Sequence, residues 1–500
     1  MNKRKSIFIA IRMLSIFFIL FSFTFFTTKI CKAEEIDSNS PSLQVNYTIR
    51  SKVATVIVEA NDNESGIKRI LYLKGDIREK SSRWEKLGKD ITNTLAFEVS
   101  TFGEYTVMVE DMAGNKTLQL ISIETEFNAV WISYLEFNDR LKDPATGIVG
   151  FTKERFEAMI DEMFDHVVEL HMNAVVVHVR PFGDAMYPSE YFPWSKYITG
   201  TQGKDPGFDP LEYMVQAAHK RDLEFHAWIN PYRVSNNTIN ITTLAKSNIA
   251  RKWLTDNYPL NDRNILPYGG ALYYNPSSAR VQAQIVNGIK EIVENYDVDG
   301  IHFDDYFYPS LGANYANNFD SAEYKEYVKE YKAIGNIPKT IADWRRNNVN
   351  KLIKKVYTAI KEIDDSVQFG ISPGGFLDYL LRDDGYYCDV KTWLSKPGYI
   401  DYICPQLYWS FSNSIYPYDK ILDRWLSLRT NEDIKVYVGI ATYKAGSSED
   451  PIWKNNADVL MNQIEYGRKT GLVSGYIYFR YDYFYKNATQ PGVKKLLGIL

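Results

Sequence analysis

The sequence predicts an α/β fold: a (β/α)8 TIM barrel preceded by a small all-β domain and a signal peptide. Two observations support this prediction. Eight short apolar runs follow one another beyond residue 126, and in each run the side chains alternate between two faces. Segments with helical spacing separate most of these runs, as the crossovers of a parallel sheet require. A barrel explains both features, because helices cover its outer face and its strands end at an active-site mouth.

The first 33 residues have the features of a secretory signal peptide. Basic residues at positions 3 to 5 precede an apolar stretch over residues 7–26, and small residues follow at the positions that signal peptidase reads. We expect cleavage after Ala33 and a protein that is secreted or associated with the cell wall. Arg12 interrupts the apolar stretch, so an uncleaved membrane anchor is the alternative.

Charge and cysteine content narrow the function classes. The chain has a formal charge of −4, and removal of residues 1–33, with six Lys and Arg and no acidic residue, leaves −10. Such a charge disfavours nucleic acid as a partner, because phosphate binding needs a basic surface. Cys388 and Cys404 remain after cleavage, too few for a disulfide scaffold. They either pair outside the cytoplasm or, as we expect for Cys404, lie free inside a barrel strand.

Residues 41–125 differ in character from the rest. Short strands separated by turn-rich pieces predict an antiparallel sandwich, with strands at residues 53–59, 67–73, 95–99 and 105–110. The run at residues 102–115 resembles bacterial immunoglobulin-like repeats. This resemblance implies an immunoglobulin-like β-sandwich that serves as a wall-binding module, a spacer or a lid.

Residues 126–500 contain the elements of the predicted barrel. The eight strands are expected at residues 129–133, 175–180, 225–230, 297–306, 369–372, 403–408, 436–441 and 476–480. Helices are expected at residues 156–170, 209–219, 279–296, 340–362, 418–428 and 454–469. Asp209 followed by Pro210 is typical of a helix start, with Asp as the N-cap.

Asp304 is the leading catalytic candidate. Residues 297–306 read as a buried strand that ends in two adjacent carboxylates, with Asp304 on the inward-facing parity. Asp305 has outward parity unless the strand has already ended, and capping or turn formation is its alternative role. Two neighbouring carboxylates repel, which raises one pKa and suits a general acid.

Glycoside hydrolysis ordinarily needs a second carboxylate. Asp184 is a candidate besides Asp305, because it follows Gly183 in the loop that leaves the second strand, where backbone can approach a ligand. A carboxylate that orders its own loop is the competing interpretation. Asp378 and Asp482, a few residues past other strand ends, are weaker options.

Other polar and aromatic side chains are predicted to line the mouth. Sugar rings stack on aromatic faces, and sugar hydroxyls need fixed donors and acceptors. The predicted substrate-binding residues are Arg180, Trp228, Asn230, His302, Tyr306, Gln406, Tyr408, Trp409 and Arg480. Arg180 and Arg480 would clamp a carboxylate substituent or steady the catalytic acid; a structural Arg–Asp pair between strands is the alternative.

Three inward histidines raise the possibility of a metal site. His178, His226 and His302 come from consecutive strands. His178 and His226 lie two and four residues below their strand ends, in deeper layers of the barrel. Buried, hydrogen-bonded histidines that support the rim are therefore preferred to metal ligands.

Four motifs together resemble the glycosyl hydrolase-like 10 family of extracytoplasmic (β/α)8 proteins. They lie at residues 179–189, 225–233, 299–306 and 404–409, and the resemblance covers nearly all of residues 126–480. It implies glycoside hydrolysis at the cell envelope, with peptidoglycan glycan strands as the substrate.

Three functional hypotheses follow. The first is a secreted glycosidase that acts on a β-linked, amino-sugar-containing wall polysaccharide through Asp304 and either Asp305 or Asp184, without metal or cofactor. The second is a non-catalytic glycan-binding barrel, and the third is a metal-dependent deacetylase that uses the histidines.

Overall fold

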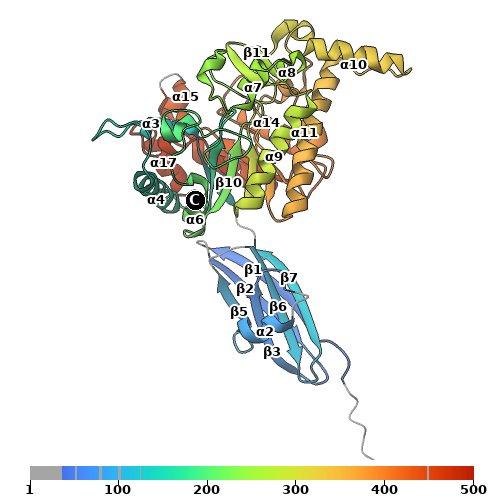
Figure 1. Ribbon diagram of the computed structural model, residues 1–500. Helices are drawn as coiled ribbons and strands as arrows, with labels where there is room; N and C mark the ends of the chain where they lie inside the picture. Colours follow the sequence, from blue (N-terminus) through green and yellow to red (C-terminus); the bar gives the residue numbers. More distant parts are fainter. Residues whose placement is uncertain (1–36, 51–52, 78–80, 100–102, 124–125, 448–449) are drawn as a thin grey trace, which may run out of the picture. The chain divides into compact units, whose positions relative to one another are not determined.

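The computed structural model describes residues 37–500 apart from 51–52, 78–80, 100–102, 124–125 and 448–449 (Figure 1). The chain forms two compact units, Met1–Thr125 and Glu126–Leu500. The predicted signal peptide lies outside the described residues. Among the helices of the described ranges, none combines the length and the hydrophobicity needed to cross a bilayer.

The N-terminal unit consists of two antiparallel sheets around one core. One sheet has the order β1-β2-β5 and the other β4-β3-β6-β7. The rings of Tyr72 and Phe97, from different sheets, stack with centroids 3.7 Å apart. The elements are β1 (Ser42–Arg50), β2 (Val53–Asn61), β3 (Ile67–Lys74), α2 (Ser81–Leu87), β4 (Lys89–Asp90), β5 (Ala96–Val99), β6 (Gly103–Asp111) and β7 (Lys116–Ile123). The four predicted strands are present, and β1, β4 and β7 were not predicted.

The C-terminal unit is a closed barrel of eight parallel strands, which confirms the barrel part of the predicted fold. The strands pair in the order β10-β13-β14-β15-β16-β17-β8-β9. They are β8 (Phe127–Ile132), β9 (Ala174–Arg180), β10 (Glu224–Ile229), β13 (Gly300–Phe303), β14 (Gln368–Ile371), β15 (Tyr402–Ile403), β16 (Lys435–Ile440) and β17 (Gly475–Tyr478). Each lies within or beside a predicted run.

Amphipathic helices surround the barrel. The longer ones are α4 (Lys153–Glu169), α6 (Pro210–His219), α9 (Ala279–Asn295), α11 (Ile341–Ile363), α14 (Tyr418–Leu428), α16 (Val459–Thr470) and α17 (Gln490–Leu497). Asp209 caps α6 as predicted, since its carboxylate accepts hydrogen bonds from the amides of Leu211 and Glu212. The single helix expected at residues 454–469 is instead two, α15 (Pro451–Asn455) and α16.

Shorter elements occupy the connections. They are α3 (Tyr134–Arg140), α5 (Lys196–Thr199), η1 (Ile241–Thr243), α7 (Ile249–Thr255), α8 (Pro259–Asp262), β11 (Ile265–Tyr268), β12 (Ala271–Tyr274), η2 (Gly312–Asn317), α10 (Ser321–Ala333), α12 (Leu377–Leu381), α13 (Val390–Trp393), η3 (Thr442–Lys444) and η4 (Tyr481–Phe484). The β11–β12 hairpin with α7 and α8 forms the long connection after β10, and α10 projects from the barrel (Figure 1).

Large inward rings fill the lower part of the barrel opposite glycines. His226 pairs in register with Gly300, and Tyr402 with Gly370. A Cβ atom on Gly370 would lie 2.0 Å from the Tyr402 ring, and one on Gly300 would lie 2.5 Å from His226. The glycines therefore provide the space that lets each ring cross the barrel.

A directed hydrogen-bond chain connects these rings. Trp131 Nε1 donates to His302 Nε2 at 3.2 Å, and an indole N–H only donates. Burial lowers the pKa of His302 well below its ordinary value, so the ring is neutral and its proton is on Nδ1. Nδ1 lies 2.9 Å from the Tyr402 hydroxyl, which leaves the tyrosine hydrogen for His226 Nδ1 at 3.0 Å. His302 is thus part of the floor beneath Asp304.

Removing the Tyr402 hydroxyl is expected to destabilise the barrel. Tyr402→Phe keeps the ring but leaves two buried imidazole nitrogens without a partner, at a cost of roughly 2 kcal/mol in the free energy of unfolding. Urea denaturation would measure the change, with Tyr258→Phe, whose side chain is 71% exposed, as the neutral control. Equal stability of the two variants would show that the chain contributes nothing.

Candidate active site

Asp304 lies at the C-terminal mouth of the barrel, directly after β13, and its side chain is 3% exposed. The inward parity predicted for it is what places it there. Three N–H groups donate to its carboxylate: Trp228 Nε1 at 3.1 Å and Asn230 Nδ2 at 3.2 Å to Oδ2, and the Tyr306 amide at 3.2 Å to Oδ1. The carboxyl group is therefore fixed from two sides, and Trp228 and Asn230, which were predicted to bind substrate, donate to the acid instead.

The environment of Asp304 favours its protonated form. Burial is the largest cause, and the neighbouring charge of Asp305 adds to it; together they raise the pKa of Asp304 to about 7, against the lowering effect of the donors. Within the part of the chain that the structure describes, the basic side chain at ion-pair distance from Asp304 is His178, whose Nε2 is 4.0 Å from Oδ2. Burial and the charge of Arg233 lower the pKa of His178 well below its ordinary value, so this ring is neutral. A carboxyl group near pKa 7 suits a general acid.

Asp305 is the second carboxylate of the mouth. The strand has ended at Phe303, so the outward parity does not apply, and Asp305 is partly buried. Burial raises its pKa to about 6, and a hydrogen bond from Gln406 opposes the rise. The Gln406 amide also donates to the Ser372 carbonyl at 3.1 Å, so its orientation is fixed. The two adjacent carboxylates thus differ in burial and in hydrogen-bond partners.

Asp184 lies in the connection that follows β9. It is 1% exposed, and Gln202 Nε2 donates to its Oδ2 at 3.1 Å. The same Gln202 accepts from the Ala245 amide through its Oε1, which connects two loops. The structure therefore places Asp184 in a buried loop contact, which agrees with the loop-ordering alternative. Asp378 forms an ion pair with Arg424, and Asp482 forms one with Arg140.

The prediction that Arg180 points into the barrel is wrong. The register between β9 and β10 shifts after the pair His178–Trp228, so that Arg180 lies opposite Ile229, an outward residue. This bulge reverses the alternation at the end of β9. The guanidinium instead lies 4.2 Å from the Phe192 ring centroid, between the barrel and α9.

The prediction for Arg480 is wrong for a related reason. In β17 it is Ile477 that joins the inner cluster, whereas the Tyr476 hydroxyl reaches the Ile464 carbonyl of α16 outside. The parity assigned to this strand was therefore inverted. Arg480 forms ion pairs with the buried Glu136 and with Asp482. It is a structural cation, the alternative left open by the sequence.

Aromatic side chains surround the carboxylates. Tyr306 is 46% exposed, and Tyr408 is close enough to Asp305 and Tyr306 for their charges to raise its pKa further beyond the effect of burial. Trp409 packs with Phe376 at 4.7 Å and Tyr416 at 5.0 Å between ring centroids. Tyr306, Tyr408 and Trp409 thus lie on the loops of the mouth, and Phe376 and Tyr416 extend the aromatic surface beside Trp409.

The three inward histidines do not converge on a common point. His226 and His302 bond the same Tyr402 hydroxyl, and His178 stacks on Trp228 with centroids 3.5 Å apart. Across the described ranges, the one set of three or more carboxylate, imidazole or thiol side chains close enough together to hold a metal ion is Asp37, Asp62 and Asp111 of the N-terminal unit. Cys388 and Cys404 are free and buried, in the outer and inner clusters respectively.

Arg233 is a residue of the mouth that the sequence did not single out. Its backbone N–H donates to Asn230 Oδ1 at 2.9 Å, and Asn230 in turn donates to Asp304. Its charge lowers the pKa of both Asp304 and Asp305. The sequence feature that could have identified Arg233 is its position at the end of the motif at residues 225–233, three residues beyond Asn230.

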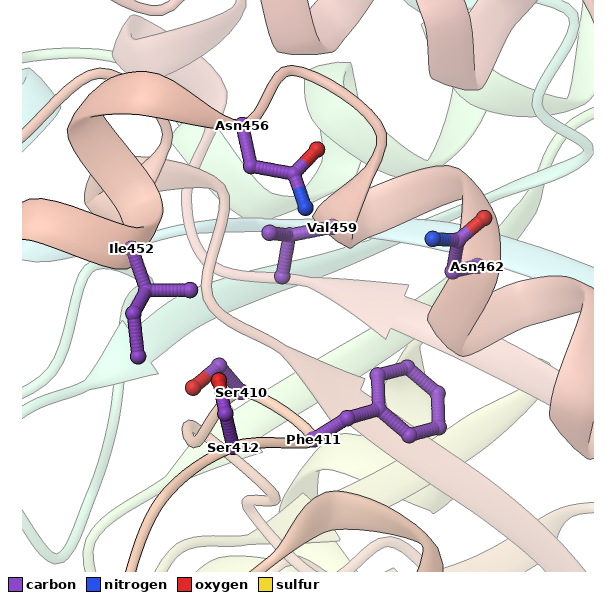
Figure 2. A pocket seen from close by; sticks show the side chains of 7 residues that line it. All are labelled: Ser410, Phe411, Ser412, Ile452, Asn456, Val459 and Asn462. Carbon is purple, nitrogen blue, oxygen red and sulfur yellow. The ribbon is translucent and has the colours of Figure 1, made fainter.

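A separate pocket of about 280 Å3 lies between the loop after β15 and helices α15 and α16 (Figure 2). Figure 2 shows its lining of Ser410, Phe411, Ser412, Ile452, Asn456, Val459 and Asn462. Neither carboxylate of the mouth lines it. It therefore offers no acid or base, although its amides and ring are of the kinds that contact sugars.

Comparison with known proteins adds a family to this geometry. The family model described as glycosyl hydrolase-like 10 matches residues 126–455. Glycosyl hydrolase YngK of Bacillus subtilis strain 168 is 37% identical over 413 residues, covering 79% of this chain and 74% of the relative. Glycosyl hydrolase DigH of Escherichia coli K12 is 37% identical over 356 residues, covering 68% of this chain and 79% of the relative.

Solved structures match more distantly. The catalytic domain of β-amylase from Paenibacillus polymyxa has a TM-score of 0.47 and 11% sequence identity, and the match covers 74% of this chain and 98% of that one. At this distance the similarity has no bearing on the function.

Proposed function

The chain belongs to the glycosyl hydrolase-like 10 family and is a glycosidase, and we propose that it cleaves a β-linked, amino-sugar-containing polysaccharide of the cell envelope, namely peptidoglycan glycan strands. The observation behind the proposal is the pair Asp304–Asp305 at the barrel mouth: two adjacent carboxylates, one fully buried under three N–H donors and the other partly open.

In this proposal Asp304 is the general acid. Its raised pKa keeps it protonated near neutral pH, so that it gives its proton to the glycosidic oxygen while the bond from that oxygen to C1 breaks. Asp305, with the lower pKa, is ionised and faces the positive charge that develops at C1. A water molecule completes the reaction: its oxygen bonds to C1, and its remaining proton restores the carboxyl pair to its starting state.

The surrounding side chains fix the acid and hold the sugar. Trp228 and Asn230 orient the Asp304 carboxyl group, and Gln406 orients Asp305. The exposed face of Tyr306, together with Trp409 and Phe376, offers flat apolar surface for pyranose rings. The neutral His178 stacks on Trp228 and fixes the indole whose N–H contacts the acid.

Activity is expected to follow a bell-shaped pH profile. Below about pH 6 Asp305 gains a proton and loses its charge, and above about pH 7 Asp304 loses the proton that it must donate. The two groups interact, so the limits belong to the pair. We expect kcat/KM to peak between these values; a profile that stays flat from pH 5 to pH 9 would contradict the roles assigned.

Product analysis tests the substrate. Purified glycan strands, with and without stem peptides, would be incubated with the protein and the products separated by mass. New reducing ends are expected. Release of acetate with the strands intact would mean a deacetylase, and retention of the strands without products would mean a glycan-binding barrel.

We also propose that the protein works outside the cytoplasm and that the N-terminal unit is an immunoglobulin-like spacer. The proposal is supported by the pattern of residues 1–33 and by the two-sheet arrangement of β1 to β7. N-terminal sequencing of the exported protein is expected to begin at Glu34. A protein that starts at Met1 and stays with the membrane would mean an uncleaved anchor.

A further inference from the structure

Arg233 is a cation at the barrel mouth. Among the described residues no carboxylate lies within ion-pair distance of it, in contrast to Arg480. Its side chain is partly open to solvent, and its charge acts on Asp304, Asp305 and Tyr306. A guanidinium that stays charged and unpaired beside an active site has its strongest interactions left for a ligand.

Two aromatic rings hold the guanidinium in place. Its central carbon lies 4.8 Å from the Phe182 ring centroid and 4.4 Å from the Tyr306 centroid. Nη2 donates to Asn236 Oδ1 at 3.0 Å, which uses one of five N–H groups. The rings contact the planar group and leave its other N–H donors available, in the fork geometry that binds a carboxylate.

Arg233 lies close to the catalytic acid, through contacts with Asn230 and Tyr306. The Asn230 side chain accepts a hydrogen bond from the Arg233 backbone N–H and donates one to Asp304. One amide group therefore positions both the catalytic acid and the backbone of the cation. Tyr306, two residues beyond Asp304, carries one of the two rings. A charged substituent on the sugar next to the cleaved bond is therefore within reach of this side chain.

We propose that Arg233 is the specificity residue that recognises a carboxylate on the glycan, the lactyl carboxylate of an N-acetylmuramic acid residue beside the scissile bond. The inference rests on the proposed function and deepens it by naming the substrate group that the enzyme recognises. The sequence had predicted that Arg180 and Arg480 bind a carboxylate substituent, but both side chains are buried. In this proposal Arg233 has that role instead.

A comparison of charged and neutral substrates tests the role. Glycan strands with free lactyl carboxylates would be compared with the same strands after reduction of these carboxylates to alcohols, and with oligomers of β-1,4-linked glucuronic acid and N-acetylglucosamine. Wild type is expected to prefer the charged strands in kcat/KM by at least about tenfold, the value of one charge-assisted contact. In Arg233→Gln this preference is expected to disappear through a higher KM for the charged strands, so that charged and reduced strands are cleaved with similar kcat/KM.

Two controls separate recognition from electrostatic tuning. Loss of the Arg233 charge raises the pKa of both aspartates, so the Arg233→Gln profile moves to higher pH, and each variant is compared at its own optimum. Arg233→Lys keeps the charge and restores the pH profile, but lacks the fork and is expected to recover only part of the preference.

Three outcomes overturn the proposal. An unchanged preference in Arg233→Gln, a shift of the pH profile alone, or wild-type cleavage of the uronate oligomers in place of the lactyl strands would each exclude lactyl recognition by Arg233. Failure of wild type to cleave any of the strands would instead contradict the proposed function itself.

Discussion

Replacement of Asp304 by asparagine is expected to lower kcat on glycan strands by about 10³-fold, within the range measured for the loss of a general acid. The amide keeps the shape of the side chain, and its carbonyl can still accept from Trp228 and Asn230, so the fold is expected to stay intact. What is lost is the proton for the departing oxygen. The measurement is kcat at the pH optimum, with thermal denaturation as the check on folding.

A change of leaving group makes this result specific. An aryl glycoside departs as a phenolate that needs little protonation, so Asp304→Asn is expected to lose far less activity on it than on the glycan. Asp184→Asn is the matched control, because its carboxylate is also buried but bonds Gln202 in a loop. We expect Asp184→Asn to leave kcat unchanged; a loss as large as that of Asp304→Asn would exchange the roles of the two.

Replacement of Asp305 by asparagine is expected to cost about as much, roughly 10³-fold in kcat, but on both kinds of substrate. The ionised carboxylate stabilises charge at C1, or attacks there, whatever the leaving group is. The pH profile of Asp305→Asn provides a second test of the role of Asp305. The charge of Asp305 raises the pKa of Asp304, so its removal lowers that pKa and moves the alkaline limb to lower pH.

The Asp305 prediction fails in two distinguishable ways. Full activity of Asp305→Asn would mean that another carboxylate, or the substrate itself, stabilises the charge at C1. An alkaline limb that moves to higher pH would mean that Asp305 does not act electrostatically on Asp304. Rates from pH 4 to pH 9 on glycan and aryl substrates would decide between these outcomes.

The barrel and its acid could be predicted because alternation is a local property. Most inward runs were readable from side-chain parity, with β17 and the end of β9 as the exceptions, and Asp304 follows its strand without interruption. Asp305 was harder, because its direction depends on where the strand ends. The turn after Phe303 decides this, and parity does not describe a turn.

The arginines show where parity reasoning stops. A bulge opposite Ile229 turns Arg180 outward. The side chains of β17 face the opposite way to the predicted parity, and Arg480 forms an ion pair with Glu136 outside the barrel mouth. Neither event has a marker in the local sequence, because both depend on how neighbouring strands and helices pack. Arg233 lies outside any barrel strand, so alternation could not find it. Its position is set by the Asn230 amide and by two rings distant in sequence.

The most direct test of the central claim is a crystal structure of Asp304→Asn bound to a glycan oligosaccharide. We predict that the uncleaved glycosidic oxygen lies about 3 Å from the side chain of residue 304, as a proton donor requires. We also predict that the sugar rings contact the aromatic side chains of Tyr306 and Trp409. An oligosaccharide bound only elsewhere, for instance in the pocket lined by Asn456 and Asn462, would contradict the assignment of the barrel mouth as the place of cleavage.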